Sequence, residues 1–487
     1  MVADVADPSL PGRCEDHRRA RDRDTGHPRR GARATDPPGR VPGAVGRSQR
    51  ADGEVAGRGV SLREEVTVLL QELLRANTVN PPGNETVAAE LLRDYLAAND
   101  VPCELVGRSP DRLNLVARLK GGDGPTLALL AHTDTVRADP DEWSRDPWSG
   151  DLVDGEIWGR GALDMKSQVA ASAVAFASLW REGFKPAGDV ILALTADEEV
   201  NEDFGLSWLV TEHPELVRAD YSINEGGGER CVFGGEVFYL CAVGEKMSAP
   251  FRVRVNGRSG HASVPSIADN ALVKAAPIIE ALGRYRPPQA IIPEIARFLE
   301  LVLGELPPLD EALSRARALH PLAAELVEPL LSFTLAPTMV KASQQINVIP
   351  AECIVTVDCR LPPGMTPADV DPLVRAAIGP GDYELEWLAS DGGTRSPMVT
   401  PLWSVLEAWA DQQDPGARLA PVVCAGFTDS HWMREAFGTV SYGFFPQKAM
   451  DSELAARLIH SADERIPVDD LELGVHALRA VVASGEG

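Results

Sequence analysis

The sequence of 487 residues lacks the features that mark three classes of protein. Its seven cysteines are scattered singly, with no CxxC pair and an odd total, so they indicate neither a disulfide framework nor a thiolate zinc site. Only 47 basic residues face 72 acidic ones, a net charge of −25. This balance argues against nucleic-acid binding, because a phosphate-tracking surface needs a basic footprint. We therefore expect a cytoplasmic protein, kept reduced, that binds no nucleic acid.

Long apolar runs are missing as well. No segment approaches the roughly 18 to 20 uninterrupted apolar residues of a membrane span, and the first residues do not form the apolar stretch of a signal peptide. We expect no membrane partner. The hydrophobic fraction of 44% is ample for packed cores, and the length exceeds what one core usually spans, which predicts two or three domains.

Residues 1–60 differ in composition from the rest of the chain. Arginine, aspartate, glycine and proline dominate this segment, which has no aromatic residue and no hydrophobic period. Such a composition predicts a disordered tail. It carries 12 arginines against nine acidic residues, so a basic interaction tail is one reading. The interspersed acids and the absence of lysine favour a non-functional extension instead.

From residue 61 onward, helical and strand patterns alternate. Ser61 can cap a helix that begins the folded part, and further helices are predicted at 85–100, 165–183 and 204–216. Apolar strands are predicted at 113–119, 126–134 and 189–199. This alternation predicts an α/β sheet whose polar strand ends meet at one edge, where active sites of open sheets collect.

The pattern changes near residue 246. Alternating strands at 251–257 and 353–361 and helices at 269–282 and 368–379 predict a compact α+β unit. We therefore predict a catalytic domain in two parts, 61–245 and 396–487, with a second domain inserted over 246–395. Within the insertion, residues of about 287–345 read as a helical, proline-interrupted segment with no assignable role.

Several polar residues follow apolar elements. His132 and Asp134 lie two apart at a strand end, on the same side of an extended chain, so the carboxylate can fix the tautomer of a metal-bound imidazole. An ordinary hydrogen-bonded pair is the plainer reading. Asp164 precedes a helix and could be only its N-cap.

Acidic residues also crowd at strand ends. Asp197, Glu198 and Glu199 end the strand VILALTA, and three consecutive buried acids repel one another unless cations or protons neutralise them. A solvated cluster at a helix entry is the alternative. Glu225 follows another apolar stretch, and His460 alone would be an ordinary loop histidine.

Five motifs nevertheless occur in order: HTDTV, GRGALDMKS, TADEE, NEGGG and IHSADE. With them the sequence resembles the M20 metallopeptidase family, which includes aminoacylases, acetylornithine deacetylase, succinyl-diaminopimelate desuccinylase and glutamate carboxypeptidases. The resemblance covers about residues 61–487. It implies an α/β fold: a metal-binding catalytic domain with a mixed sheet flanked by helices, plus an inserted α+β lid and dimerisation domain.

The resemblance also implies roles for the motif residues. Asp164 would bridge two Zn²⁺ ions, often beside a cis peptide to Met165. His132 and Glu225 would complete one metal site, and Glu199 and His460 the other. Asp134 would orient His132, and Glu198 would take a proton from the attacking water and return it to the leaving nitrogen. Two histidines with three carboxylates suit zinc, and Co²⁺ or Mn²⁺ is also possible.

Substrate contacts are implied by weaker matches. His261 resembles a lid histidine that stabilises the oxyanion in a neighbouring subunit, which implies a homodimer. Asn347 and Arg360 match lid positions that contact the carbonyl region and carboxylate of the substrate, although Arg360 could equally be a structural strand residue. Gly426 begins a pocket loop in which Phe427 replaces a glycine.

These features predict a dinuclear-zinc hydrolase acting on a small molecule. Its substrate would be an N-acyl amino acid or a dipeptide-like amide bearing a free carboxylate. A dinuclear metal phosphoesterase is an alternative, but no basic cluster for phosphate accompanies the acidic motifs. A non-catalytic binding protein that retains the fold is the other, and the presence of Glu198 beside all five ligands argues against it.

Overall fold

The computed structural model describes residues 61–485, so the predicted tail over 1–60 lies outside the described residues. The first helix begins where Ser61 caps it: the Ser61 hydroxyl accepts from the backbone N–H of Glu64, and the Glu64 side chain accepts from the backbone N–H of Ser61. Within the described part no helix is long and apolar enough to cross a membrane.

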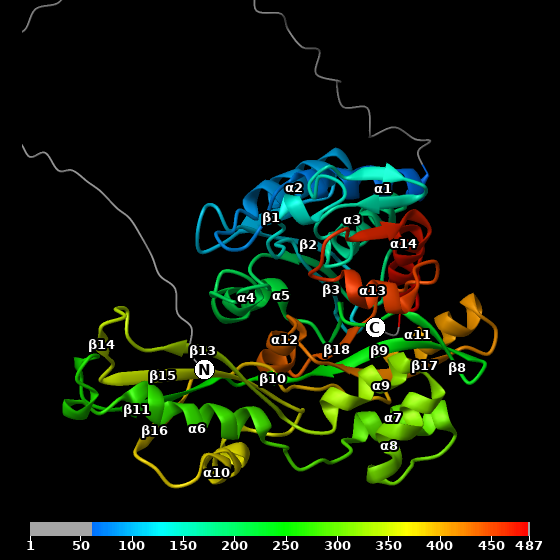
Figure 1. Cartoon of the computed structure of the whole chain (residues 1–487). Helices are drawn as coiled ribbons and strands as arrows, with labels where there is room; N and C mark the ends of the chain where they lie inside the picture. The colour runs from blue at the N-terminus through cyan, green and yellow to red at the C-terminus, as the bar shows by residue number, and fades with distance from the viewer. Residues whose placement is uncertain (1–60, 486–487) are drawn as a thin grey trace, which may run out of the picture. The chain divides into compact units, whose positions relative to one another are not determined.

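A nine-stranded mixed sheet forms the larger framework of the described residues (Figure 1). Strands β6, β3, β7 and β18 run parallel in its middle, while β1, β2 and β8 pair antiparallel with their neighbours. In sheet order the strands are β1 (Cys103–Val106), β2 (Asn114–Leu119), β6 (Val190–Thr195), β3 (Leu127–His132), β7 (Tyr221–Asn224), β18 (Val440–Gly443), β9 (Glu236–Glu245) and β17 (Arg418–Cys424), with β8 (Arg230–Phe233) beside β9.

Helices cover both faces of this sheet because its strands alternate side chains between two apolar clusters. Leu129 packs in the cluster of α1, α3 and α14, whereas the next residue, Leu130, packs in the cluster of α4, α5 and α12. The helices on the first face are α1 (Leu62–Arg75), α2 (Thr86–Ala98), α3 (Lys166–Arg181), α11 (Pro401–Gln413) and α14 (Val468–Ala483); those on the second are α4 (Leu206–Glu212), α5 (Pro214–Val217) and α12 (Ser430–Phe437).

One predicted helix is wrong in its extent. The pattern over 204–216 predicts a single helix, but α4 ends at Glu212 and α5 begins at Pro214. Proline has no N–H to donate and disfavours helical backbone in the residue before it, so it begins a new helix here.

A five-stranded antiparallel sheet follows in the chain, covered by two helices. Its alternating strands bury Val253, Val255, Val355 and Val357, as the sequence pattern predicts. The strands are β10 (Met247–Ser248), β15 (Glu352–Leu361), β11 (Phe251–Asn256), β16 (Tyr383–Trp387) and β13 (Thr334–Lys341); the helices are α6 (Ala271–Arg284) and α10 (Pro367–Ile378).

The segment of about 287–345 contributes to both sheets. Its helices α7 (Pro293–Leu303), α8 (Leu309–Leu319) and α9 (Pro321–Val327) pack in one apolar cluster with β8, β9 and β17 of the nine-stranded sheet. The segment then continues into β13, which pairs with β15. The helical insertion therefore extends the core of the large sheet, while the domain division at 245 and 395 stays a prediction.

Three smaller elements complete the framework of the site. A two-stranded ribbon joins β12 (Gly260–His261) to β14 (Val348–Ile349). A three-stranded sheet joins β4 (Asp151–Val153), β5 (Glu156–Trp158) and β19 (Arg465–Pro467). Helix α13 (Ser452–Leu458) ends just before His460.

Candidate metal centre

The ends of three neighbouring parallel strands carry most of the site. His132 is the last residue of β3, the acids Asp197 to Glu199 follow β6, and Glu225 follows β7. Because β6, β3 and β7 are parallel neighbours, their carboxyl ends meet at one edge of the sheet. Asp164, two residues before α3, and His460, just after α13, complete the group.

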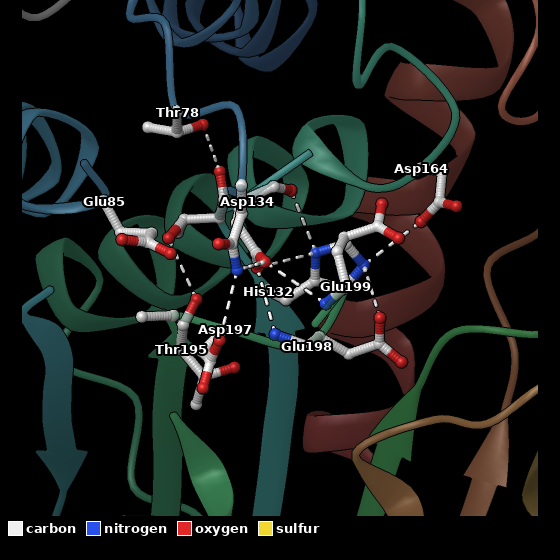
Figure 2. Close-up of polar contacts among 12 residues, drawn as sticks. Thr78, Glu85, His132, Asp134, Asp164, Thr195, Asp197, Glu198 and Glu199 are labelled. Atoms are coloured by element: carbon white, nitrogen blue, oxygen red, sulfur yellow. Dashed lines mark hydrogen bonds and ion pairs between the residues drawn. The ribbon is translucent and has the colours of Figure 1, made fainter. Parts of the chain in front are cut away.

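The carboxylate of Asp164 lies between two imidazoles. Its Oδ1 is 3.1 Å from Nε2 of His132, and its Oδ2 is 3.1 Å from Nε2 of His460. Nε2 of His460 is also 3.2 Å from Oε2 of Glu199. The peptide bond between Asp164 and Met165 is cis, as the sequence resemblance implies. The Asp164 carboxylate thus faces both imidazoles, and Figure 2 shows its contact with His132.

Two further acids approach the same nitrogen of His132. Oε2 of Glu225 is 3.7 Å and Oε2 of Glu198 is 3.9 Å from Nε2 of His132. Ligand atoms of His132, Asp164 and Glu199 lie close enough to hold one cation, and those of His132, Glu198 and Glu225 form a second such group. The structure therefore brings together all five predicted ligands and the predicted base.

The electrostatics of this cluster fit bound cations. Burial raises the pKa of Glu225 to about 7, and burial together with the Glu225 carboxylate raises the pKa of Glu198 well above its usual range. Oε1 of Glu199 is buried without a hydrogen-bond partner. Crowded buried acids with an unpartnered oxygen need positive charge, and imidazole with carboxylate donors suits zinc-like divalent ions. The residues present fit a pair of such ions.

Asp134 connects His132 to the acidic turn. Nδ1 of His132 is 3.1 Å from the backbone carbonyl oxygen of Asp134 and 3.4 Å from its carboxylate Oδ1. The same buried carboxylate accepts the backbone N–H groups of Glu198 and Glu199, both at 3.2 Å. Asp134 therefore contacts the imidazole, as the sequence predicts, and also holds the turn that carries Glu198.

Asp197, the first acid of the triplet, is not a candidate ligand. Its backbone is left-handed, with φ of 69°, and its carboxylate accepts the N–H groups of Glu202 and Phe204 at 2.7 and 3.0 Å. The Arg112 guanidinium donates to Asp197 at 3.0 Å and to both oxygens of Glu85 at 2.5 and 2.7 Å. This buried cluster fixes the turn behind Glu198, and the sequence offered no sign of it.

We expect Arg112→Met to lower the free energy of unfolding by about 3–5 kcal/mol, because the variant leaves the buried Glu85 and Asp197 carboxylates without their cation. Urea unfolding measures the loss. The neighbouring Arg108 is the matched control, since its pair with Asp203 at 2.7 Å is exposed, and Arg108→Met should cost less than about 1 kcal/mol. Equal losses of unfolding free energy in the two variants would show that the buried cluster stabilises the protein no more than the exposed ion pair does.

Glu464 positions the loop that carries Asp164. This fully buried carboxylate accepts the backbone N–H groups of Leu163, Asp164 and Gly161 at 2.6, 2.9 and 3.0 Å. It also pairs with the Arg160 guanidinium at 2.6 Å. Glu464 is the last residue of the motif IHSADE, but its spacing from the other motif residues did not predict a role for it.

Glu464→Gln should weaken metal affinity about 10- to 100-fold, as loss of a residue that orients a ligand typically does. The amide replaces one acceptor oxygen by a donor, which opposes the N–H groups of the loop. Titration of metal-free protein with Zn²⁺ measures the affinity. Glu156→Gln is the control, because Glu156 forms a comparable pair with Arg465 on the adjacent small sheet at 3.0 Å. A control that weakens binding as strongly would contradict the proposed role.

The predicted substrate residues lie elsewhere in the described structure. His261 is exposed on β12, and its Nδ1 is 2.7 Å from the Ser263 hydroxyl. The exposed Asn347 lies beside it, because the Asn347 carbonyl accepts the Ala262 N–H at 3.0 Å. Arg360 on β15 donates from Nε to both oxygens of Asp358 at 3.2 Å. Within residues 61–485 no hydrogen bond or ion pair joins His261, Asn347 or Arg360 to the metal-site residues, so their roles stay predictions.

The loop that begins at the exposed Gly426 does reach the site. Asp429 is buried, and its carboxylate accepts the Thr195 hydroxyl at the end of β6 at 2.9 Å. Burial raises the pKa of Asp429 to about 7. The next residue, Ser430, bonds to Asn224 beside the predicted ligand Glu225 at 3.1 Å. The sequence identified this loop, but it did not single out Asp429.

Fold and site together define a metallopeptidase-type hydrolase, an enzyme of the peptidase and amidohydrolase class. Residues 128–484 match the model of Peptidase family M20/M25/M40, and the chain belongs to this family. The mixed α/β fold is the fold of this family. The chain is thereby a hydrolase of amide bonds.

The chain is similar to relatives of more than one kind. The chain is 29% identical over 378 residues to the N-fatty-acyl-amino acid synthase/hydrolase PM20D1 of Xenopus tropicalis, covering 73% of this chain and 72% of the relative. It is 27% identical over 422 residues to succinyl-diaminopimelate desuccinylase of Paracoccus denitrificans, covering 83% and 94%. The M20 metallo-carboxypeptidase Sso-CP2 of Sulfolobus solfataricus shares the fold, with a TM-score of 0.66, 18% identity, and coverage of 86% and 98%.

Proposed function

We propose that this chain hydrolyses the amide bond of N-acyl amino acids or dipeptide-like substrates that carry a free carboxylate, using two Zn²⁺ ions, with Co²⁺ or Mn²⁺ as possible substitutes. The observation that carries the proposal is the Asp164 carboxylate between His132 and His460, with Glu198 beside it. His132 and Glu225 would hold one ion, Glu199 and His460 the other, and Asp164 would bridge them. Metal ions held there lower the pKa of bound water and polarise the substrate carbonyl.

Glu198 would perform the proton transfers. Its carboxylate lies beside His132, and burial raises its pKa well above its usual range, the direction that a group which acts first as base and then as acid requires. In the first step Glu198 accepts the proton of the attacking water. In the second it donates that proton to the leaving nitrogen, which prevents the amide bond from re-forming. Asp134 fixes the turn so that the Glu198 carboxylate stays in reach.

The oxyanion and substrate carboxylate would be bound by residues of the second sheet and its ribbon. We propose that His261 serves a neighbouring subunit in a homodimer, with Asn347 beside it, and that Arg360 and the loop at Gly426 bind the substrate. Large exposed apolar side chains on α6, on β13 and before Asn347 support a subunit interface: Val273 and Met339 are each 67% exposed, and Ile346 is fully exposed. The molar mass in solution tests the dimer, and a monomer would contradict it.

We further propose a cytoplasmic location. The described cysteines are all unpaired, and most of them are buried, which suits a reducing compartment. Fractionation of the source cells tests this, and recovery of the protein outside the cytoplasm would contradict it.

The experiment that tests the function is an assay of amino-acid release. Purified protein would be loaded in turn with Zn²⁺, Co²⁺ and Mn²⁺, its metal content measured, and each form incubated with a panel of acyl-amino acids and dipeptides. We expect two metal equivalents and release of the free amino acid. No release with any of the three metals would overturn the proposal, and hydrolysis of a phosphoester but of no amide would favour the phosphoesterase alternative.

A further inference from the structure

A cavity of about 180 Å³ lies between helix α9 and the strands β9 and β17. One wall is helix α9, which contributes Leu322 and Leu326, four residues apart on one helix face. The opposite walls come from the sheet and from α13 and comprise Leu240 of β9, Val422 and Val423 of β17, and Ala456. The helical insertion thus closes a space over the carboxyl-terminal part of β17.

Residues of the cavity wall are next to two predicted site residues in the sequence. Its wall includes Gly226, the residue after the predicted ligand Glu225. It also includes Cys424 and Ala425, which precede the predicted substrate-binding Gly426. Sγ of Cys424 lies 3.6 Å from the carbonyl oxygen of Gly226, so these two stretches of wall touch. The cavity wall therefore begins one residue from the predicted ligand Glu225.

The chemistry of the walls selects what can bind. Most of the lining is aliphatic, and the charged residues in it are two carboxylates, Glu229 and Glu325, with no basic residue among them. Burial raises the pKa of Glu229. An anionic group would lose its hydration in this cavity, whereas an aliphatic chain would gain by leaving water. The cavity suits a neutral, apolar part of a substrate.

We propose that this cavity binds the aliphatic tail of the substrate's acyl group, and that helix α9 of the insertion makes the enzyme selective for medium or long unbranched acyl chains over charged ones. This inference rests on the proposed function. The free carboxylate of the substrate must then bind outside the cavity. The helical insertion, to which the sequence assigned no role, would then determine which acyl groups the enzyme accepts.

A series of acyl groups on one amino acid tests the selectivity in the metal-loaded enzyme. Acetyl, butanoyl, octanoyl and succinyl derivatives would be compared by kcat/KM. Each methylene that enters the cavity should raise kcat/KM about fourfold until the cavity is full. The succinyl derivative, which has the same four carbons as butanoyl, should react at least about tenfold more slowly than butanoyl because its carboxylate loses its hydration among the aliphatic walls. A flat series, or preference for succinyl, would overturn the inference.

Matched substitutions locate the effect. Leu326→Trp fills the cavity and should lower the ratio of octanoyl to acetyl activity at least about tenfold, the value of two or more buried methylenes. Leu313→Trp is the control, because Leu313 on α8 is partly buried in the same apolar cluster but does not line the cavity. Its ratio should stay as in the parent protein, and an equal change in the two variants would contradict the inference.

A second variant and the metal content separate loss of folding from loss of selectivity. Should Leu326→Trp not fold, Ala456→Trp narrows the same cavity from an exposed position on α13. Both variants should keep the parent's metal content. Failure of the parent to hydrolyse any acyl-amino acid would reject the proposed function itself, whereas hydrolysis without dependence on acyl length would reject the cavity alone.

Discussion

Glu198→Gln is expected to lower kcat by about 10³- to 10⁴-fold, near the upper end of what loss of a general base costs. The glutamine side chain keeps the size of glutamate but cannot accept the water proton. The Asp134 carboxylate accepts the backbone N–H of Glu198, a contact that survives the substitution, so the turn should hold its shape. Steady-state kinetics with the best substrate of the panel measure the loss.

Metal content decides whether Glu198 is a base or a ligand. Its carboxylate lies 3.9 Å from Nε2 of His132, hardly farther than that of the predicted ligand Glu225 at 3.7 Å. A base can be replaced without loss of metal, so the variant should retain two equivalents. A variant that loses one equivalent would make Glu198 a ligand instead. Glu202→Gln, an exposed neighbour in the same acidic segment, should leave both kcat and metal content unchanged.

Asp164→Asn should abolish activity together with metal binding. The two oxygens of Asp164 face different histidines, so its removal affects both proposed sites at once. An amide has one oxygen and no charge, so it cannot offer a carboxylate oxygen to each of the two proposed metal sites. We expect the loss of at least one of about two bound metal equivalents and a fall in kcat/KM of at least about 10⁴-fold, because the metal ions provide the activated water and the polarised carbonyl.

Elemental analysis of the purified variant measures this loss. Asp151→Asn on the exposed strand β4 controls for the removal of one aspartate and should bind metal as the parent does. An Asp164→Asn variant that keeps both equivalents would show that Asp164 does not bridge the ions. Retention of metal with loss of activity would assign Asp164 a role in substrate binding or proton transfer.

The elements that form the site follow from local patterns. The apolar strands ending at His132 and Thr195 are predicted from their side chains, and both exist with their polar residues at the carboxyl ends. The helix after Asp164 and the alternating strand containing Val355 and Val357 are also confirmed. These predictions succeed because the period of buried side chains depends on neighbours within a few residues. The break between α4 and α5 at Pro214 is also a local effect, because proline acts on the residue before it. The helical spacing of apolar residues over 204–216 nevertheless predicted one helix.

The residues that hold the site in place depend on partners far away in sequence. Glu464 bonds to the backbone of Asp164 across 300 residues, and Arg112 pairs with Asp197 across 85. Neither contact has a local signature, because a buried acid and a surface acid look alike in sequence until the fold supplies the partner. The packing of α7–α9 on β17 is equally non-local.

The sequence by itself determined the α/β alternation, the resemblance to the M20 family and the six residues, Asp164 among them, that the structure brings together. The tertiary structure decided that Asp197 is a structural acid, that Glu464 holds the Asp164 loop, and that the helical insertion closes an apolar cavity beside Glu225. The types of residue that can bind metal and the spacing of hydrophobic residues can be read from short stretches of the chain. A residue becomes buried only when distant segments of the chain pack together. Burial then decides whether the residue binds a ligand, holds a loop in place or lines a cavity.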